Sequence, residues 1–131
     1  MFSHVSLGTD DFDRAVAFYD AVLGVLGLTR VATLPDYPAA GWGRAPGVQP
    51  QLWLTRPYDG HAAAPGNGAM VAFEAPDRAV VDAAHAAALA AGGTDEGAPG
   101  PRPHYHPHYY GAYFRDRDGN KLHVVCRAPP G

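Results

Sequence analysis

The chain has 131 residues, of which 47% are hydrophobic and 18% are charged, so we expect one compact folded domain. Its formal net charge is -3 with 10 Lys and Arg residues, which excludes a basic surface for nucleic acid. A single cysteine, Cys126, excludes an intramolecular disulfide framework. No apolar run approaches the roughly 18 residues of a membrane span, and no secretory signal is visible, so we expect a cytoplasmic protein.

The first half of the chain predicts a strand, a helix and three further strands. Residues 3–8 alternate in character, as a short strand does. Thr9-Asp10 offers a helix N-cap, and Gly27 is placed to end the helix. The apolar residues between them recur at helical spacing: Phe12, Val16, Tyr19, Leu23 and Leu26. The three strands are expected over 28–34, 39–44 and 51–56, with turns at 35–38 and 45–50.

The second half repeats this order after a stretch rich in Gly, Pro and Ala over 57–68. A strand is expected over 69–75. Pro76 suits the first helical position of an Ala-rich helix over 77–91. Residues 97–107 are interpreted as an irregular loop. The last two strands are expected over 109–115 and 121–127, joined by a hairpin turn at Asp118-Gly119.

A short internal repeat supports this division. The tetrapeptide Asp13-Arg14-Ala15-Val16 recurs as Asp77-Arg78-Ala79-Val80, and each copy follows a short strand and opens a helix. Neither half is long enough to bury a stable core alone. We therefore expect one α+β domain of two packed modules, about 2–57 and 68–127 with a linker at 58–67, built on curved, antiparallel-rich sheets.

Both ends of the chain carry a resemblance to a known family. The stretches HVSLGTDDFDRAVAFYDAVLGVLGL and YGAYFRDRDGNKLHVVC resemble the vicinal oxygen chelate superfamily of glyoxalases, bleomycin-resistance proteins and extradiol dioxygenases. The turn over 115–120 between two strands is the most specific part, and the likeness extends over 3–127. The resemblance implies two tandem βαβββ modules whose mixed sheets form a cup that binds small molecules.

The resemblance also implies where a divalent metal (Zn, Fe, Ni or Mn) would bind, on the first and last strands of each module. Those four positions hold His4, Trp53, Met70 and His123 in this sequence. The two histidines are competent ligands, whereas indole and thioether groups are unsuitable for such a metal. A third ligand would have to come from Glu74 or His106. A hydrogen-bonded interior histidine is the alternative interpretation of His4.

Aromatic side chains suggest a different use for the cup. Trp42, Trp53, Tyr110 and Tyr113 could offer ring faces to a ligand, together with Met70. The segment 104–110 (HYHPHYY) is interpreted either as a pocket rim, with Tyr110 facing the cup, or as a Pro-fixed loop with solvated histidines.

Three functions remain open at this point. The first is a protein with a degenerate metal site that binds a small aromatic or oxygen-rich molecule. The second is a metal-dependent lyase or dioxygenase acting on vicinal oxygens, and the third is a protein–protein module. We also expect a homodimer, because curved half-cups leave strand edges that need covering.

Overall fold

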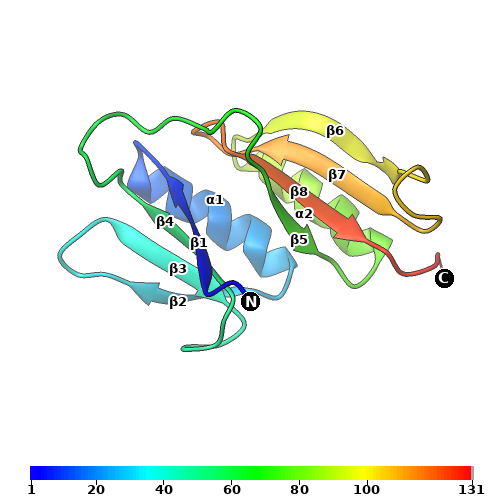
Figure 1. Ribbon diagram of the computed structural model, residues 1–131, viewed down its shortest axis with the longest axis horizontal. Helices are drawn as coiled ribbons and strands as arrows, with labels where there is room; N and C mark the ends of the chain where they lie inside the picture. Colours follow the sequence, from blue (N-terminus) through cyan, green and yellow to red (C-terminus); the bar gives the residue numbers. More distant parts are fainter. Residues whose placement is uncertain (131) are drawn as a thin grey trace.

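The computed structural model, which describes residues 1–130, is an α+β fold of two modules with the same order of elements (Figure 1). The first module contains β1 (His4–Gly8), α1 (Phe12–Val25), β2 (Thr29–Thr33), β3 (Ala39–Gly43) and β4 (Gln51–Thr55). The second contains β5 (Val71–Glu74), α2 (Arg78–Ala90), β6 (Thr94–Pro101), β7 (Tyr110–Arg115) and β8 (Lys121–Cys126). The expected βαβββ repeat is confirmed.

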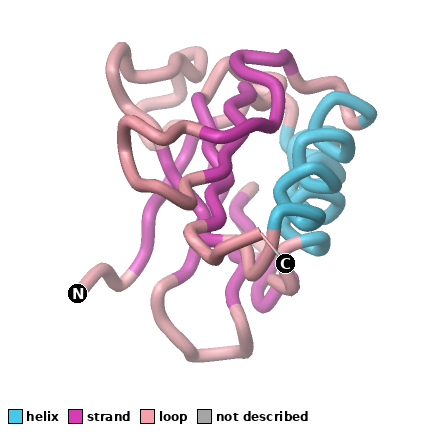
Figure 2. Tube along the Cα trace, turned by 90° about the vertical axis from the view of Figure 1, so that its right-hand side faces the viewer, coloured by secondary structure: helices cyan, strands magenta, loops and turns pink. Residues whose placement is uncertain are grey.

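Each module forms its own four-stranded mixed sheet, in the order β1-β4-β3-β2 and β5-β8-β7-β6. The pairs β1–β4 and β5–β8 are parallel, and the other neighbours are antiparallel. Both helices lie on one side of the sheets (Figure 2). No helix within 1–130 combines the length and apolarity needed to cross a membrane.

The structure corrects the first part of the expected loop over 97–107, while residues 102–107 are loop as expected. Thr94–Pro101 is the strand β6, which pairs with β7 through two shifts in register. Its glycines and prolines do not suggest a strand. They are compatible with one here because β6 is an edge strand, where a residue without an N–H group leaves no partner unsatisfied.

Both helix starts lie slightly further along the chain than expected. The N-cap of α1 is Asp11 rather than Thr9-Asp10, and its side chain accepts the N–H of Arg14. The N-cap of α2 is Asp77, so Pro76 precedes the helix instead of opening it. The two helices begin in the same way, because in each an aspartate carboxylate accepts a hydrogen bond from a free N–H group of the first turn.

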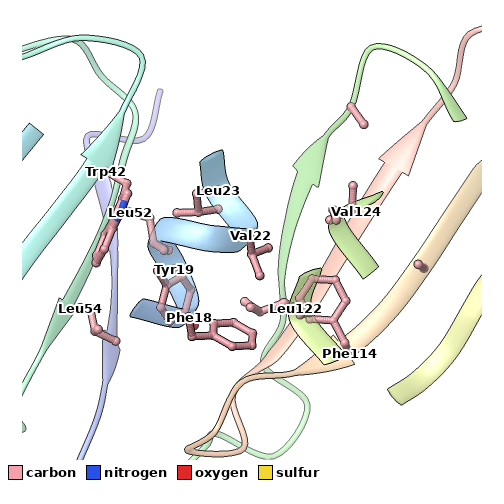
Figure 3. Close-up of a cluster of buried hydrophobic side chains, with 14 of the residues drawn as sticks. Phe18, Tyr19, Val22, Leu23, Trp42, Leu52, Leu54, Phe114, Leu122 and Val124 are labelled. Atoms are coloured by element: carbon pink, nitrogen blue, oxygen red, sulfur yellow. The ribbon is translucent and has the colours of Figure 1, made fainter. Parts of the chain in front are cut away.

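One hydrophobic core extends through both modules (Figure 3). Phe18, Tyr19, Val22 and Leu23 of α1 are all buried, between side chains from the first sheet and side chains from the second. The first sheet contributes Trp42, Leu52 and Leu54, and the second contributes Phe114, Leu122 and Val124. Helix α1 also packs against α2. Neither module therefore keeps a complete core when it is separated from the other.

A buried hydrogen bond joins the modules at the turn between β7 and β8. The Tyr19 hydroxyl donates to Oδ2 of Asp116 over 2.5 Å. Burial raises the pKa of Tyr19 well above its ordinary value, and the Asp116 charge raises it further, so the hydroxyl keeps its proton. Asn120 adds a second link, from its Nδ2 to the carbonyl of Gly8 over 3.1 Å.

We expect Tyr19→Phe to lower the free energy of unfolding by about 1–2 kcal/mol, because it removes one donor from a carboxylate that keeps its other donors. Urea denaturation of both proteins would measure the difference. Tyr37→Phe is the matched control, since the exposed Tyr37 hydroxyl bonds only backbone carbonyls. Equal stability losses in the two variants would contradict a role of Tyr19 at the junction.

Candidate functional site

The two sheets share an open face, which we define as the sheet surfaces turned away from α1 and α2. In β8, Leu122 and Val124 belong to the core, so Lys121 and His123 point the other way. In β4, Leu52 and Leu54 are in the core, and alternation places Gln51, Trp53 and Thr55 on the open face. His4 and Ser6 are the register partners of Gln51 and Trp53 and lie on the same side. Both histidines of the predicted metal site are therefore on this face.

In the first module, an indole ring takes the place of a ligand. Trp53 lies across Gly41 of the neighbouring strand, so closely that a methyl group at Gly41 would be 2.6 Å from its Cε2. Its Nε1 donates to the side-chain oxygen of Gln51 over 3.0 Å, which fixes the ring in that position. Nearby, His4 is exposed, and its Nδ1 is 2.9 Å from the Ser3 hydroxyl.

In the second module, His123 is enclosed by aromatic rings. Only 1% of the residue is exposed. The Tyr113 ring stacks on the imidazole with centroids 4.0 Å apart, and the Tyr109 ring lies nearly parallel to it at 5.8 Å. Gly111 of β7 makes room for the imidazole, because a methyl group there would be 2.5 Å from Cε1 of His123. A glycine thus accommodates a ring in both modules.

Both nitrogens of His123 are engaged in hydrogen bonds. Nδ1 is 2.8 Å from the carbonyl of Ala112, which can only accept, so Nδ1 carries the proton. Nε2 is then the acceptor for the Tyr109 hydroxyl at 2.7 Å. Coordination of a metal through either nitrogen would require one of these bonds to break.

Electrostatics keep the same imidazole neutral. Burial lowers the pKa of His123 below its ordinary value, and the positive charges of Arg102, Arg127 and Lys121 lower it further. The hydrogen bond with Ala112 acts in the opposite direction but does not outweigh them. His123 is therefore uncharged at neutral pH and accepts a proton only in more acidic solution.

The remaining candidate ligands do not complete a metal site within one chain. Met70 is 44% exposed and directly precedes β5. Glu74 is exposed and forms an ion pair with Arg127 at 3.5 Å, while Nδ1 of His106 accepts the N–H of His108 over 3.0 Å. Across residues 1–130, no group of three or more His, Cys, Asp or Glu side chains is close enough to hold a metal ion. The donors present do not fit such a site.

Two of the four predicted aromatic residues lie on the other side of the sheets. Trp42 is 1% exposed in the core, where its Nε1 donates to Asp20 over 2.9 Å. The Tyr110 hydroxyl donates to Asp82 of α2 over 2.7 Å, so Tyr110 faces the helix rather than the cup. Of the four, Trp53 and Tyr113 are on the open face.

Tyr109 takes the place expected for Tyr110, and sequence reasoning missed it. The signal was available in the alternation of β7. Ala112 and Phe114 are buried in the core, so residues of the opposite parity, Tyr109, Gly111 and Tyr113, belong to the open face.

Comparison with known proteins places this architecture in a family. The model of the Glyoxalase/Bleomycin resistance protein/Dioxygenase superfamily matches residues 1–124. The chain belongs to this superfamily. No match was found among curated protein sequences.

Solved structures of superfamily proteins resemble the chain over nearly its whole length. A glyoxalase/bleomycin resistance protein from Albidiferax ferrireducens is 37% identical with a TM-score of 0.83, over 98% of this chain and 99% of that one. Lactoylglutathione lyase from Agrobacterium tumefaciens is 27% identical with a TM-score of 0.64, over 96% and 92%. A glyoxalase-related enzyme from Fulvimarina pelagi, 19% identical with a TM-score of 0.74 over 96% and 87%, shows the shared fold alone.

The hydrogen bonds of His123 predict an uncommon tautomer that NMR can detect. We expect nitrogen shifts of a neutral ring protonated at Nδ1, and a titration midpoint below the ordinary value of about 6.5 for histidine. His123→Gln identifies the signal. A ring protonated at Nε2, or a midpoint above about 6.5, would contradict the arrangement.

Proposed function

We propose that the protein binds a small planar molecule, aromatic or oxygen-rich, on its open face without the help of a metal ion. The observation that carries the proposal is the state of His123, which is stacked on the Tyr113 ring and hydrogen-bonded at both nitrogens, to Tyr109 and to Ala112. Trp53 and Met70, at two other ligand positions of the family, also support binding without a metal, because neither side chain is a suitable metal ligand.

Ring faces are the recognition elements of this surface. Trp53 is held flat over Gly41 by its bond to Gln51, so a ligand would meet a ring that loses little freedom on binding. Stacking on such a ring contributes about 0.5–1.5 kcal/mol beyond area burial. The exposed side chains of His4 and Ser6 are near Trp53 in the register and can exchange hydrogen bonds with ligand oxygens.

A second copy of the chain is part of the proposal. Within one chain the two halves of the open face lie side by side, and β1 and β5 are edge strands of separate sheets. Apolar groups are exposed close to these edges, including Phe2 at 65%. A pocket of about 380 Å³ between the two edges is lined mainly by apolar residues, among them Phe2, Val5, Leu28 and Phe73. Val5 and Phe73 face the helix side of the sheets, so this pocket is separate from the open face. A homodimer would cover these edges and deepen the open face into a cup.

The alternative function is a metal-dependent lyase or dioxygenase; the similar structure from Agrobacterium tumefaciens is named a lyase. It would require the bond between Tyr109 and His123 to open and further ligands to come from outside the chain. These requirements make it the second candidate.

Ligand binding in the presence of EDTA tests the proposal. We expect 2-naphthol to bind and to perturb NMR signals of Trp53 and Tyr113, while decahydro-2-naphthol, its saturated analogue with the same carbon skeleton, binds more weakly. Trp53→Ala should weaken 2-naphthol binding by about fivefold, the equivalent of a stacking contribution near 1 kcal/mol.

Two controls make the result specific. Trp53→Phe should retain most of the affinity, and Tyr58→Ala, which changes a fully exposed ring outside the open face, should leave it unchanged. Failure of 2-naphthol to bind on this face would contradict the proposal. Binding that appears only when a divalent metal replaces EDTA would favour the alternative enzyme.

A further inference from the structure

Basic side chains gather around the stacked rings of the second module. The guanidinium carbon of Arg102 is 5.8 Å from the centre of the Tyr113 ring, and the Lys121 ammonium is 5.3 Å from it. The guanidinium carbon of Arg127 is 5.2 Å from the centre of the Tyr109 ring. We call these three residues the basic cluster. Each is within the range of a cation–π contact.

Acidic groups compensate little of this charge. Within residues 1–130, only Arg127 of the cluster is in salt-bridge range of a carboxylate, that of the exposed Glu74 at 3.5 Å. The neighbouring Arg115 differs, because it is paired with Glu96 at 2.6 Å. Arg102 and Lys121 therefore hold two uncompensated positive charges, although the whole chain carries a net charge of -3.

Arg102 is fixed in place before any ligand arrives. Its Nη2 donates to the carbonyl of Ala98 over 3.0 Å, and its Nη1 donates to that of Pro101 over 3.3 Å. Gly100 of β6 allows this close approach, since a methyl group there would be 3.1 Å from Nη1. A guanidinium ordered in this way loses little conformational freedom when it binds an anion.

We propose that the basic cluster binds the anionic group of a small aromatic acid, with a carboxylate placed between Arg102 and Lys121. The planar part of the ligand would pack against Tyr105, which is 60% exposed and whose ring centre is 5.1 Å from that of Tyr109. This inference rests on the proposed function and narrows it to an anionic ligand class. Arginine and lysine are the donors suited to carboxylate oxygens.

The neutral His123 does not attract the anion by charge, but its titration midpoint is expected to change when an anion binds. The basic cluster lowers the pKa of His123, and a bound anion would offset part of that field. Occupation of the site should therefore raise the NMR titration midpoint of His123. A neutral ligand of the same shape should not have this effect.

Benzoate and benzamide form a matched pair of probes, because they share a ring and a planar head group but differ in charge. In EDTA at low ionic strength, we expect benzoate to bind at least ten times more tightly than benzamide. The affinity for benzoate should fall as salt is added, and its binding should raise the His123 midpoint.

Substitutions in the basic cluster test where benzoate binds. Arg102→Gln and Lys121→Gln should each weaken benzoate binding at least fivefold and leave benzamide binding unchanged. Arg56→Gln, which removes an exposed arginine from the first module, is the control and should have no effect. Circular dichroism shows whether each variant is folded, and Lys121→Gln keeps the test available if Arg102→Gln disturbs β6.

The outcomes separate this inference from the proposed function. Equal binding of benzoate and benzamide, or benzoate binding unaffected by both variants, overturns the anionic ligand class and leaves planar recognition intact. Binding of 2-naphthol without binding of benzoate also overturns the anionic ligand class and leaves planar recognition intact. Absence of binding by all three probes overturns both proposals.

Discussion

The contact of α1 with both sheets is the constraint on which the rest of the structure depends. Its buried residues Phe18, Tyr19, Val22 and Leu23 fill the space between the sheets, and the hydrogen bond from Tyr19 to Asp116 closes the junction. Two modules of this size cannot each bury a sufficient core. Because α1 and α2 occupy the same side of both sheets, no helix of residues 1–130 covers the opposite side, and the candidate site lies there.

On that open face, two of the four positions that carry ligands in the family, Trp53 and His123, hold rings that hydrogen bonds fix in place. Trp53 lies over Gly41 and His123 lies beside Gly111, so a glycine of the adjacent strand accommodates the ring in each module. The resulting surface is aromatic and, in the second module, positively charged. Stacking and charge can then supply the recognition that metal coordination supplies elsewhere.

Much of the fold is predictable from local signals. The repeated Asp-Arg-Ala-Val tetrapeptide and the Asp118-Gly119 turn locate the two modules. Helical spacing in α1 identifies Val16, Tyr19 and Leu23 as core residues but misses Phe18 and Val22. The strand β6 is not predictable in this way, because pairing with β7 outweighs the preference of its glycines and prolines for turns.

The candidate site is harder to predict from the sequence than the fold is. Counting alternation from Ala112 and Phe114 would have placed Tyr109, and not Tyr110, beside His123. The burial of His123 depends on the loop that precedes β7, whose path no periodicity encodes. Trp42 and Trp53 cannot be distinguished by residue type, since only the register between β3 and β4 places Trp42 opposite Leu52 in the core.

Metal titration of the protein, purified without a His-tag and treated with EDTA, tests the central claim most directly. Calorimetry with Zn²⁺ and Ni²⁺ should show no stoichiometric binding at the open face, and the NMR signals of His123 should remain those of the imidazole bonded to Tyr109 and Ala112. A stoichiometric metal that displaces the Tyr109 bond and is lost in His123→Ala would contradict the account.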